Sequence, residues 1–537
     1  MPLLDTSVEP PNLFPTGFPI RQSLLVLLNI LPEVMIHHML VPLFPFMTMT
    51  LMSRSDDIAG VSAAKSNYAY YAGLLQSAYF FPSIFMTVVW GCISDRAGRK
   101  PVLLCGVVGY GLGAMLLGMS TDYGVAMLAL IVCGLFAANA AVAKCMMGEL
   151  SLTDEARAFG YSVYGVAYGA AGIVGSALGG LLGDPALFAG SSFLQQRPYF
   201  AACALGVVLA VAAASSNCLF LKETINATWT YDSAVPSTQE ALQRRPASSS
   251  LVVFDGDAAS ENGLGCSCKS HGRVQLPIPT PIPVPVPTAV PGGNGCRSLK
   301  NTIKFVVLRL IRVARRLSMV IGSLLASRPG AIVGPTVPVI LYATYALCNS
   351  IYGTSLPVLI AAAPHQGGFG LGPREAGVAM TTLGIAKLCA KLFFYPLQRR
   401  FGTLSVYQIG CALLVPAALI PPLFGSSSLW PSLLVSAVLI GIGEGLLYVS
   451  AIVMVTHFAR PEHLGAVHGV AGCLVSLART LGPYVAGLAW QRSALSGQTW
   501  IVFTLVSLSA FAGLVLVRKI DTKASDAGTT DTKAFDI

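Results

Sequence analysis

The residues of this sequence whose types and spacing suit chemistry are charged side chains set between long apolar runs. The segment Gly91–Lys100, GCISDRAGRK, places Asp95, Arg96, Arg99 and Lys100 in one short turn. A carboxylate at the end of a helix needs a cationic partner, which Arg96 or Arg99 can supply. The chemistry available here is ion pairing between neighbouring elements. The alternative is that the basic residues only orient the chain in a membrane.

Four ionisable residues lie inside apolar runs and are candidates for coupling a proton or a substrate to movement: Glu33, Lys144, Glu444 and Arg479. A charged side chain at the centre of a bilayer costs about 2.5–3.5 kcal/mol on insertion scales, so a residue kept there marks a functional site. For Glu33 the alternative is a carboxylate near the membrane surface. For Arg479 the alternative is a structural brace. Lys387 and Lys391 lie near the end of a run, and we expect both to extend to the membrane surface.

The sequence contains no motif that is typical of catalysis or of cofactor binding. It contains no phosphate-binding glycine loop, no catalytic triad and no cluster of metal-binding histidines. Cys266, Cys268 and His271 form a short motif, but the ligands are too few and their spacing does not fit a closed zinc site. We therefore expect no enzymatic activity, no cofactor and no bound metal.

Composition indicates that a membrane is the solvent of this chain. Hydrophobic residues make up 54% of its 537 residues and charged residues only 11%, against about 25% in soluble domains. Residues 1–20 have no basic region before an apolar core, so the first apolar run is expected to be a retained span rather than a signal peptide. The net charge of +10 is spread over short turns and one central segment, which indicates membrane orientation and not nucleic-acid binding.

Twelve apolar runs are long enough to cross a bilayer, which takes about 20 residues. The expected fold is an all-α membrane protein whose twelve transmembrane helices form two pseudo-symmetric six-helix bundles. The expected spans are 22–50, 71–93, 100–120, 123–147, 158–182, 199–221, 331–360, 375–397, 404–424, 430–457, 465–489 and 499–517. The expected parts are an N-terminal tail (1–21), a first bundle (22–221), a central segment (222–330), a second bundle (331–518) and a C-terminal tail (519–537).

Basic residues in the loops predict the orientation of the chain. Even-numbered connections and the C-terminal tail hold more arginine and lysine than odd-numbered connections, which places both termini and the central segment in the cytosol. Within that segment, residues 277–287 form a proline-rich tract that we expect to be an extended spacer, the alternative being a docking strip. Residues 299–317 predict a basic amphipathic helix that lies on the membrane surface or covers the cytosolic end of the bundle.

The segment Gly91–Lys100 closely resembles the loop between helices 2 and 3 of the major facilitator superfamily. The resemblance covers nearly all of the membrane portion and is closest to drug:proton antiporters of the tetracycline-resistance type and to the zinc-induced facilitator family with its fungal relatives. Leu43–Phe46, Lys144 with Glu149, and Leu481–Gly487 also resemble that group. The resemblance implies the major facilitator fold and a conformational latch between its two halves. The implied latch residues are Gly91, Asp95, Arg96, Gly98, Arg99 and Lys100.

The resemblance also implies a helix-packing motif, made of Gly172, Gly175, Gly179, Gly180, Gly482 and Pro483. Small residues at this spacing let helices approach closely. The sequence departs from the family twice. Ser176 stands where the helix-5 motif usually has proline, and Leu130 stands where helix 4 usually has an arginine that is implicated in proton coupling. Both departures leave transport without proton coupling open.

These observations predict a secondary transporter that works by alternating access. The expected task is proton-coupled efflux of a small organic or amphipathic molecule: a secondary metabolite such as a glycolipid, a drug or an organic acid. Few fixed charges in the spans favour a largely apolar or weakly charged substrate. The alternatives are an uncoupled facilitator, a vacuolar metal-chelate transporter and a membrane sensor that does not transport. We expect a monomer in a lipid bilayer, with the plasma membrane favoured over the vacuolar membrane.

Overall fold

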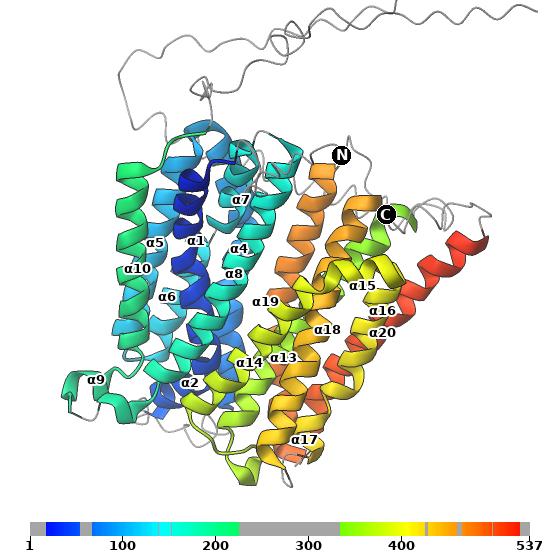
Figure 1. The fold of residues 1–537 in the computed structure, drawn as a ribbon. Helices are drawn as coiled ribbons and strands as arrows, with labels where there is room; N and C mark the ends of the chain where they lie inside the picture. Colours follow the sequence, from blue (N-terminus) through cyan, green and yellow to red (C-terminus); the bar gives the residue numbers. More distant parts are fainter. Residues whose placement is uncertain are drawn as a thin grey trace, which may run out of the picture. The chain divides into compact units, whose positions relative to one another are not determined.

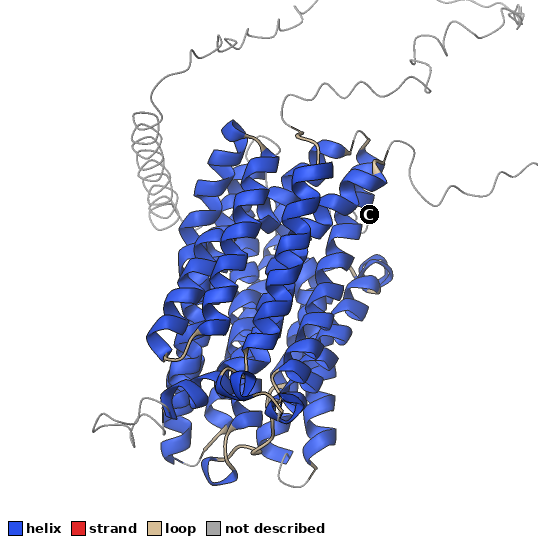
Figure 2. Cartoon of the chain, turned by 90° about the vertical axis from the view of Figure 1, so that its left-hand side faces the viewer, coloured by secondary structure: helices blue, strands red, loops and turns tan. Residues whose placement is uncertain are grey.

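The computed structural model describes residues 18–53, 67–137, 139–151, 153–188, 190–224, 333–424, 428–458, 464–496 and 498–526. Within these ranges the regular structure is helical, with short connections and no strands (Figure 2). Ten of the described helical segments are long and apolar enough to cross a membrane, and a bent pair of helices makes an eleventh. The proline-rich tract and the predicted helix at 299–317 lie outside the described residues.

The first half contains six helical spans, drawn in blue to green in Figure 1. Its first span is broken by the 3-10 turn η1 (Val41–Leu43), whose second residue is Pro42. Proline has no N–H to donate to an α-helical ladder, which favours a break there. The helices of this half are α1 (Ile20–Leu40), α2 (Phe44–Ser53), α4 (Tyr68–Ala97), α5 (Arg99–Met119), α6 (Tyr123–Phe136), α7 (Asn139–Leu150), α8 (Asp154–Leu182), the short α9 (Ser192–Gln196) and α10 (Phe200–Phe220).

The second half also contains six helical spans, drawn in green to red in Figure 1. Its first helix, α13 (Val333–Ala361), packs against α18, α19 and α20, so it belongs to the bundle as fully as the more apolar spans do. The other helices of this half are α14 (Pro373–Leu392), α15 (Phe394–Phe401), α16 (Thr403–Ala417), α17 (Ile420–Phe424), α18 (Leu429–Phe458), α19 (Leu464–Ser496) and α20 (Trp500–Asp526).

Two of the expected spans are not continuous helices. In the fourth span, α6 ends at Phe136 and α7 begins at Asn139. In the eighth span, α14 and α15 meet at an angle of 51°. Pro396 follows this bend and cannot donate a hydrogen bond to the carbonyl of Leu392, which explains why the helix does not run straight through. Hydropathy indicates the length of an apolar run but not whether its helix is continuous, so neither break was predicted.

The outer surface of the helices is apolar. Leu112, Val208, Leu219 and Leu508 are each more than 60% exposed, on three different helices. Soluble monomers rarely expose so much contiguous apolar surface, and a bilayer removes the cost of exposing it. The helical surface therefore fits a multi-pass integral membrane protein.

The two halves repeat one backbone feature. Gly98 joins α4 to α5 with φ 106° and ψ 157°, and Gly402 joins α15 to α16 with φ 78° and ψ 157°. A side chain is strained at these angles, so both turns require glycine. Both glycines follow a basic residue in the preceding helical turn, Arg96 before Gly98 and Arg400 before Gly402. The match supports an internal duplication.

Contacts between the halves lie from the middle of the bundle to the end opposite Gly98. The first half of α4 meets α19, where Ser77 Oγ donates to the Thr480 carbonyl over 2.7 Å. The second half of α8 meets the beginning of α14, where a β-carbon at Gly180 would lie 2.6 Å from Gly377 Cα. At the Gly98 end, no described atom lies within 4 Å of the β-carbon position of Gly91 or Gly165. The contacts described here between the halves therefore lie away from the Gly98 turn.

Replacing Gly180 by valine is expected to slow transport at least tenfold, because the new side chain cannot fit against the backbone of Gly377 and Pro373. Gly165→Val on the same helix is the matched control, since a β-carbon there meets no described atom within 4 Å. Initial uptake rates in proteoliposomes measure both variants. Equal rates for Gly180→Val and Gly165→Val would show that this contact does not limit the conformational cycle.

Candidate functional site

The Gly98 turn is held by the carboxylate of Glu223, which is not among the residues predicted from the sequence. The backbone N–H of Arg99 donates to Glu223 Oε1 over 2.8 Å, and that of Lys100 donates to Glu223 Oε2 over 3.0 Å. These are the first N–H groups of α5, which have no partner inside their own helix. Glu223 follows α10 directly. It therefore acts as an N-cap for α5 from a distant part of the chain.

Arg99 is the centre of the charged network at this turn. Its guanidinium is 2.7 Å from Asp95 Oδ1 and 2.8 Å from Glu149 Oε1, and it also donates to Ser94 Oγ over 2.5 Å. The Arg99 side chain is only 10% exposed, whereas the Asp95 side chain is 60% exposed. A guanidinium can donate to several oxygens at fixed angles, which a lysine cannot do. Arg99 thereby ties the end of α4 to α7.

All of these partners of Asp95 and Arg99 belong to the first half. Thr224 completes the network by donating to Glu149 Oε2 over 2.5 Å, and Lys100 Nζ donates to the Cys218 carbonyl. Of the two cations that could pair with Asp95, Arg99 lies in contact with it. The sequence indicated Asp95, Arg99 and Glu149, and it missed Glu223 and Thr224. The latch between the halves stays a prediction.

Glu444 forms a buried ion pair in the second half. Its side chain is 0% exposed, and its Oε2 lies 2.5 Å from Lys387 Nζ and accepts a hydrogen bond from Asn349 Nδ2 over 2.8 Å. Its other oxygen, Oε1, is buried without a hydrogen-bond partner among the described atoms. Lys387 therefore does not extend to the membrane surface as expected, because a buried carboxylate on α18 offers it a closer partner.

Glu33 occupies the break between α6 and α7. It is 8% exposed, and the backbone amides of Asn139 and Ala140 face its carboxyl group, with Lys144 in electrostatic range. The N-terminus of a helix favours a negative charge, so the beginning of α7 stabilises the carboxylate of Glu33. The break lies within the span Tyr123–Leu150. This places Glu33 inside the bundle rather than at the membrane surface.

Arg479 lies among aromatic side chains from both halves. It interacts electrostatically with Tyr168 of α8, Tyr342 and Tyr345 of α13, and Tyr448 of α18. The described residues give Arg479 no hydrogen bond and no ion pair, and its role as a brace stays an open alternative. Lys391 Nζ lies 4.6 Å from the ring centre of Tyr448. Tyr342, Tyr345 and Tyr448 contact one another, with ring centres 5.7–6.3 Å apart.

We call Arg479, Lys391, Tyr168, Tyr342, Tyr345 and Tyr448 the central cluster. The few charges within the spans are unequal in sign. Across the four ionisable candidates and the two helix-8 lysines, four side chains are cations and two, Glu33 and Glu444, are carboxylates. Because Glu444 already pairs with Lys387, the remaining charge of this group is positive.

The glycines of the helix-packing motif lie where helices approach closely. A β-carbon at Gly172 would lie 3.1 Å from the His38 ring, and one at Gly175 would lie 2.8 Å from the Met35 carbonyl oxygen. A β-carbon at Gly179 would collide with the backbone of Met39, and Gly180 faces α14 instead. In α19, a β-carbon at Gly482 would meet Ser350 of α13, and the Pro483 carbonyl lies against Gly73 of α4.

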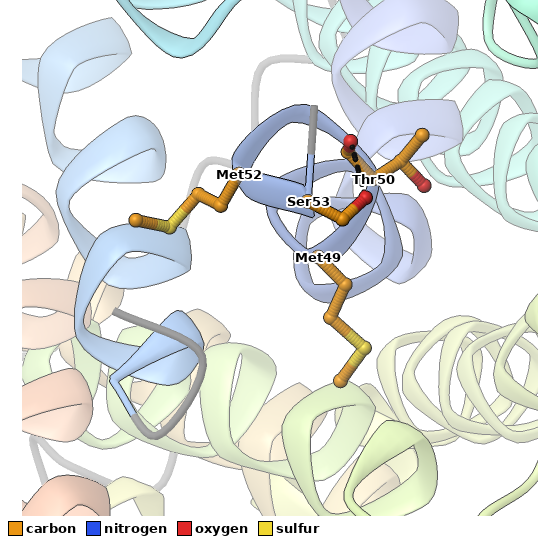
Figure 3. A pocket seen from close by; sticks show the side chains of 4 residues that line it. All are labelled: Met49, Thr50, Met52 and Ser53. Carbon is orange, nitrogen blue, oxygen red and sulfur yellow. Dashed lines mark hydrogen bonds between the residues drawn. The ribbon is translucent and has the colours of Figure 1, made fainter. Parts of the chain in front are cut away.

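A depression of about 370 Å³ lies at the end of α2. It is lined by Met49, Thr50, Met52 and Ser53, and Figure 3 shows Ser53 Oγ bonded to the Thr50 carbonyl while both methionine side chains point away. It lies at the end of a described range, away from the buried charges, so it gives no reason to expect a substrate there. Among the described residues no group of three metal-ligating side chains comes together, and Cys266, Cys268 and His271 lie outside them.

The helices and the buried charges define a membrane transporter built of two six-helix halves. A sequence model described as Major Facilitator Superfamily matches residues 27–252 and 338–534. The chain belongs to this superfamily, and the expected twelve-helix fold and the family resemblance are confirmed. Members of this family carry small molecules across membranes.

Individual relatives match over most of the chain. It is 24% identical over 93% of its length to the major facilitator superfamily multidrug transporter mfsB of Aspergillus fumigatus, covering 83% of that protein. It is 23% identical over 86% of its length to the protein zinc induced facilitator 1 of Arabidopsis thaliana, covering 85% of that protein. Among solved structures, a D-xylose-proton symporter matches 92% of this chain and 97% of its own with a TM-score of 0.60 at 11% identity, which shows the fold.

Proposed function

We propose that this protein exports a small organic molecule by alternating access and couples export to an inward flow of protons. The observation that carries the proposal is the Glu444–Lys387 pair, a buried acid and base between α18 and α14. Protonating Glu444 removes the charge that holds Lys387 and so weakens the tie between these two helices. A similarity to a named multidrug transporter supports export.

The position of α14 links this proton site to movement. The same helix that carries Lys387 also carries Gly377, which contacts Gly180 of the first half. A change in the α14–α18 contact therefore acts on the helix that joins the halves at one end of the bundle. At the other end, we propose that the Gly91–Lys100 loop contacts the second half when that end closes. We also propose that both termini and this loop lie in the cytosol. The membrane that we propose for the protein is the plasma membrane.

The test uses the full chain in proteoliposomes with an imposed pH gradient. The probes are 2-naphthoate, 2-naphthalenemethanol and 2-naphthylmethylamine, which share one ring system and differ in charge. At least one probe is expected to reach a higher level in the proteoliposomes than in protein-free liposomes, into which weak acids and bases also distribute passively, and to lose this difference when an uncoupler collapses the pH gradient. Flux that ignores the pH gradient would refute proton coupling.

An uncoupled facilitator is the second candidate. Ser176 favours it, because this residue replaces the proline that would bend helix 5 in the antiporters that the chain resembles. In that case the probe would equilibrate across the membrane in the same proteoliposomes without accumulating. The two candidates therefore differ in one measurement.

A further inference from the structure

We propose that the central cluster is a binding site for a small organic anion, whose acid group pairs with Arg479 and whose apolar or aromatic body lies against the tyrosines. The proposal rests on the proposed function only in that the chain transports a small organic molecule. It does not depend on proton coupling.

The first argument is that Arg479 and Lys391 lack counter-ions. The described residues place no carboxylate within ion-pair distance of either side chain. Glu444 is committed to Lys387 at 2.5 Å, and Glu33 lies beside the beginning of α7. Two cations without a counter-ion inside a bundle are unfavourable unless a bound anion or water compensates them. Their positions therefore predict a ligand of negative charge.

The second argument is that the cluster is reachable. Arg479, Lys391, Tyr168, Tyr342 and Tyr448 are each half-buried, although each lies well inside a long helix. Residues at such positions are normally sealed by neighbouring helices, as Glu444 is at 1% exposure. Partial exposure there means that these side chains are open to a molecule of the size of water, so neighbouring helices do not seal the cluster. The two histidines of α1 lie nearby, with His38 6.2 Å from Tyr168 between ring centres.

The third argument is that the groups match one class of ligand. A guanidinium binds a carboxylate or sulfonate through two parallel N–H bonds, which fixes the orientation of the anion. Tyrosine hydroxyls can donate further hydrogen bonds to its oxygens, and tyrosine rings offer flat apolar surface to an aromatic body. Tyr168 comes from the first half and Tyr448 from the second. A ligand held between them contacts both halves, as a transported substrate must.

The positive charge of the central cluster also argues against an organic cation as its ligand. An organic cation in this place would lie next to Arg479 and Lys391 with no free carboxylate to offset the repulsion. Like charges placed side by side repel, so a cation would bind there less tightly than a neutral molecule of the same shape. The cluster therefore discriminates by charge, with neutral molecules of the same shape between the two extremes.

The experiment measures binding of the three naphthalene probes to the full chain in nanodiscs of pure phosphatidylcholine, which contains no anionic lipid. Equilibrium dialysis with naphthalene fluorescence gives each Kd. The parent protein is expected to bind 2-naphthoate at least about tenfold more tightly than the alcohol, and the amine least tightly. Arg479→Met should lower the affinity for 2-naphthoate about tenfold or more and leave that for the alcohol unchanged. Arg479→Lys should retain part of the preference.

Arg492→Met is the matched control, because Arg492 lies on the same helix and its side chain is exposed. It is expected to bind all three probes as the parent does. Equal affinities for the three probes in the parent, or an unchanged affinity for 2-naphthoate in a monodisperse Arg479→Met protein, would overturn the proposal. No pH gradient exists in a nanodisc. A failure of proton coupling therefore leaves this result untouched, and a failure of anion preference leaves proton coupling untouched.

Discussion

Glu444→Gln is expected to abolish accumulation driven by a pH gradient and to lower the thermal stability of the protein. Glutamine keeps the shape of the side chain but cannot exchange a proton. It also leaves Lys387, whose side chain is 24% exposed, without the carboxylate that lies 2.5 Å from its ammonium group. Removing one member of a buried pair costs up to about 3–5 kcal/mol, and partial exposure of Lys387 reduces this to about 2 kcal/mol.

A double variant separates the two effects. Glu444→Gln with Lys387→Met leaves no unpaired charge, so we expect it to recover most of the lost thermal stability while proton-driven accumulation stays absent. Proteoliposome uptake and the unfolding midpoint in detergent measure these properties. If the double variant regained proton-driven accumulation, Glu444 would be only a structural partner of Lys387. Glu33→Gln then becomes the next variant to examine, because Glu33 is also a carboxylate buried within a span.

Arg99→Met is expected to reduce transport more than tenfold and to destabilise the first half. The substitution removes the cation that joins Asp95, Ser94 and Glu149. It leaves Glu149, whose side chain is 33% exposed, with Thr224 as its remaining hydrogen-bond partner. Losing a charge-assisted network of this kind costs about 2–3 kcal/mol. Thermal midpoint and initial transport rate are the measurements.

Two variants calibrate this result. Arg99→Lys keeps the charge but not the fork of donors, so it should fall between the parent and Arg99→Met. Lys100→Met should be close to the parent, because among the described residues the Lys100 ammonium donates to the Cys218 carbonyl alone, at the exposed surface. An Arg99→Met protein with full transport would show that the Gly91–Lys100 loop serves only to orient the chain in the membrane.

The number and order of the spans could be predicted because hydropathy depends on residues that are adjacent in the chain. The pairing of Lys387 with Glu444 could not, because it depends on the rotational register of α14 against α18, which a single sequence does not contain. Lys387 by itself resembles a residue that reaches the membrane surface. Only its buried partner distinguishes the two cases.

At the Gly98 turn too, contacts between residues close in the chain could be predicted and contacts between distant residues could not. Asp95 and Arg99 are four residues apart, so their contact follows from helix geometry. Glu223 lies more than a hundred residues away and resembles any polar residue at the end of a span. The break between α6 and α7 was not predicted either, because the residues around it other than Asn139 are small or apolar and suit a continuous helix.

Different kinds of interaction stabilise the two ends of the bundle. At one end the halves meet through glycine backbone, as at Gly180 and Gly377, and through uncharged hydrogen bonds such as Ser77 to Thr480. At the other end the Arg99 network consists of full charges, partly exposed. Dissolved salt screens charges over about 10 Å at 0.1 M and has little effect on packed backbone. We therefore expect the ionic strength on the Gly98 side of the membrane to change the rate of the conformational cycle. The ionic strength on the opposite side should leave this rate unchanged.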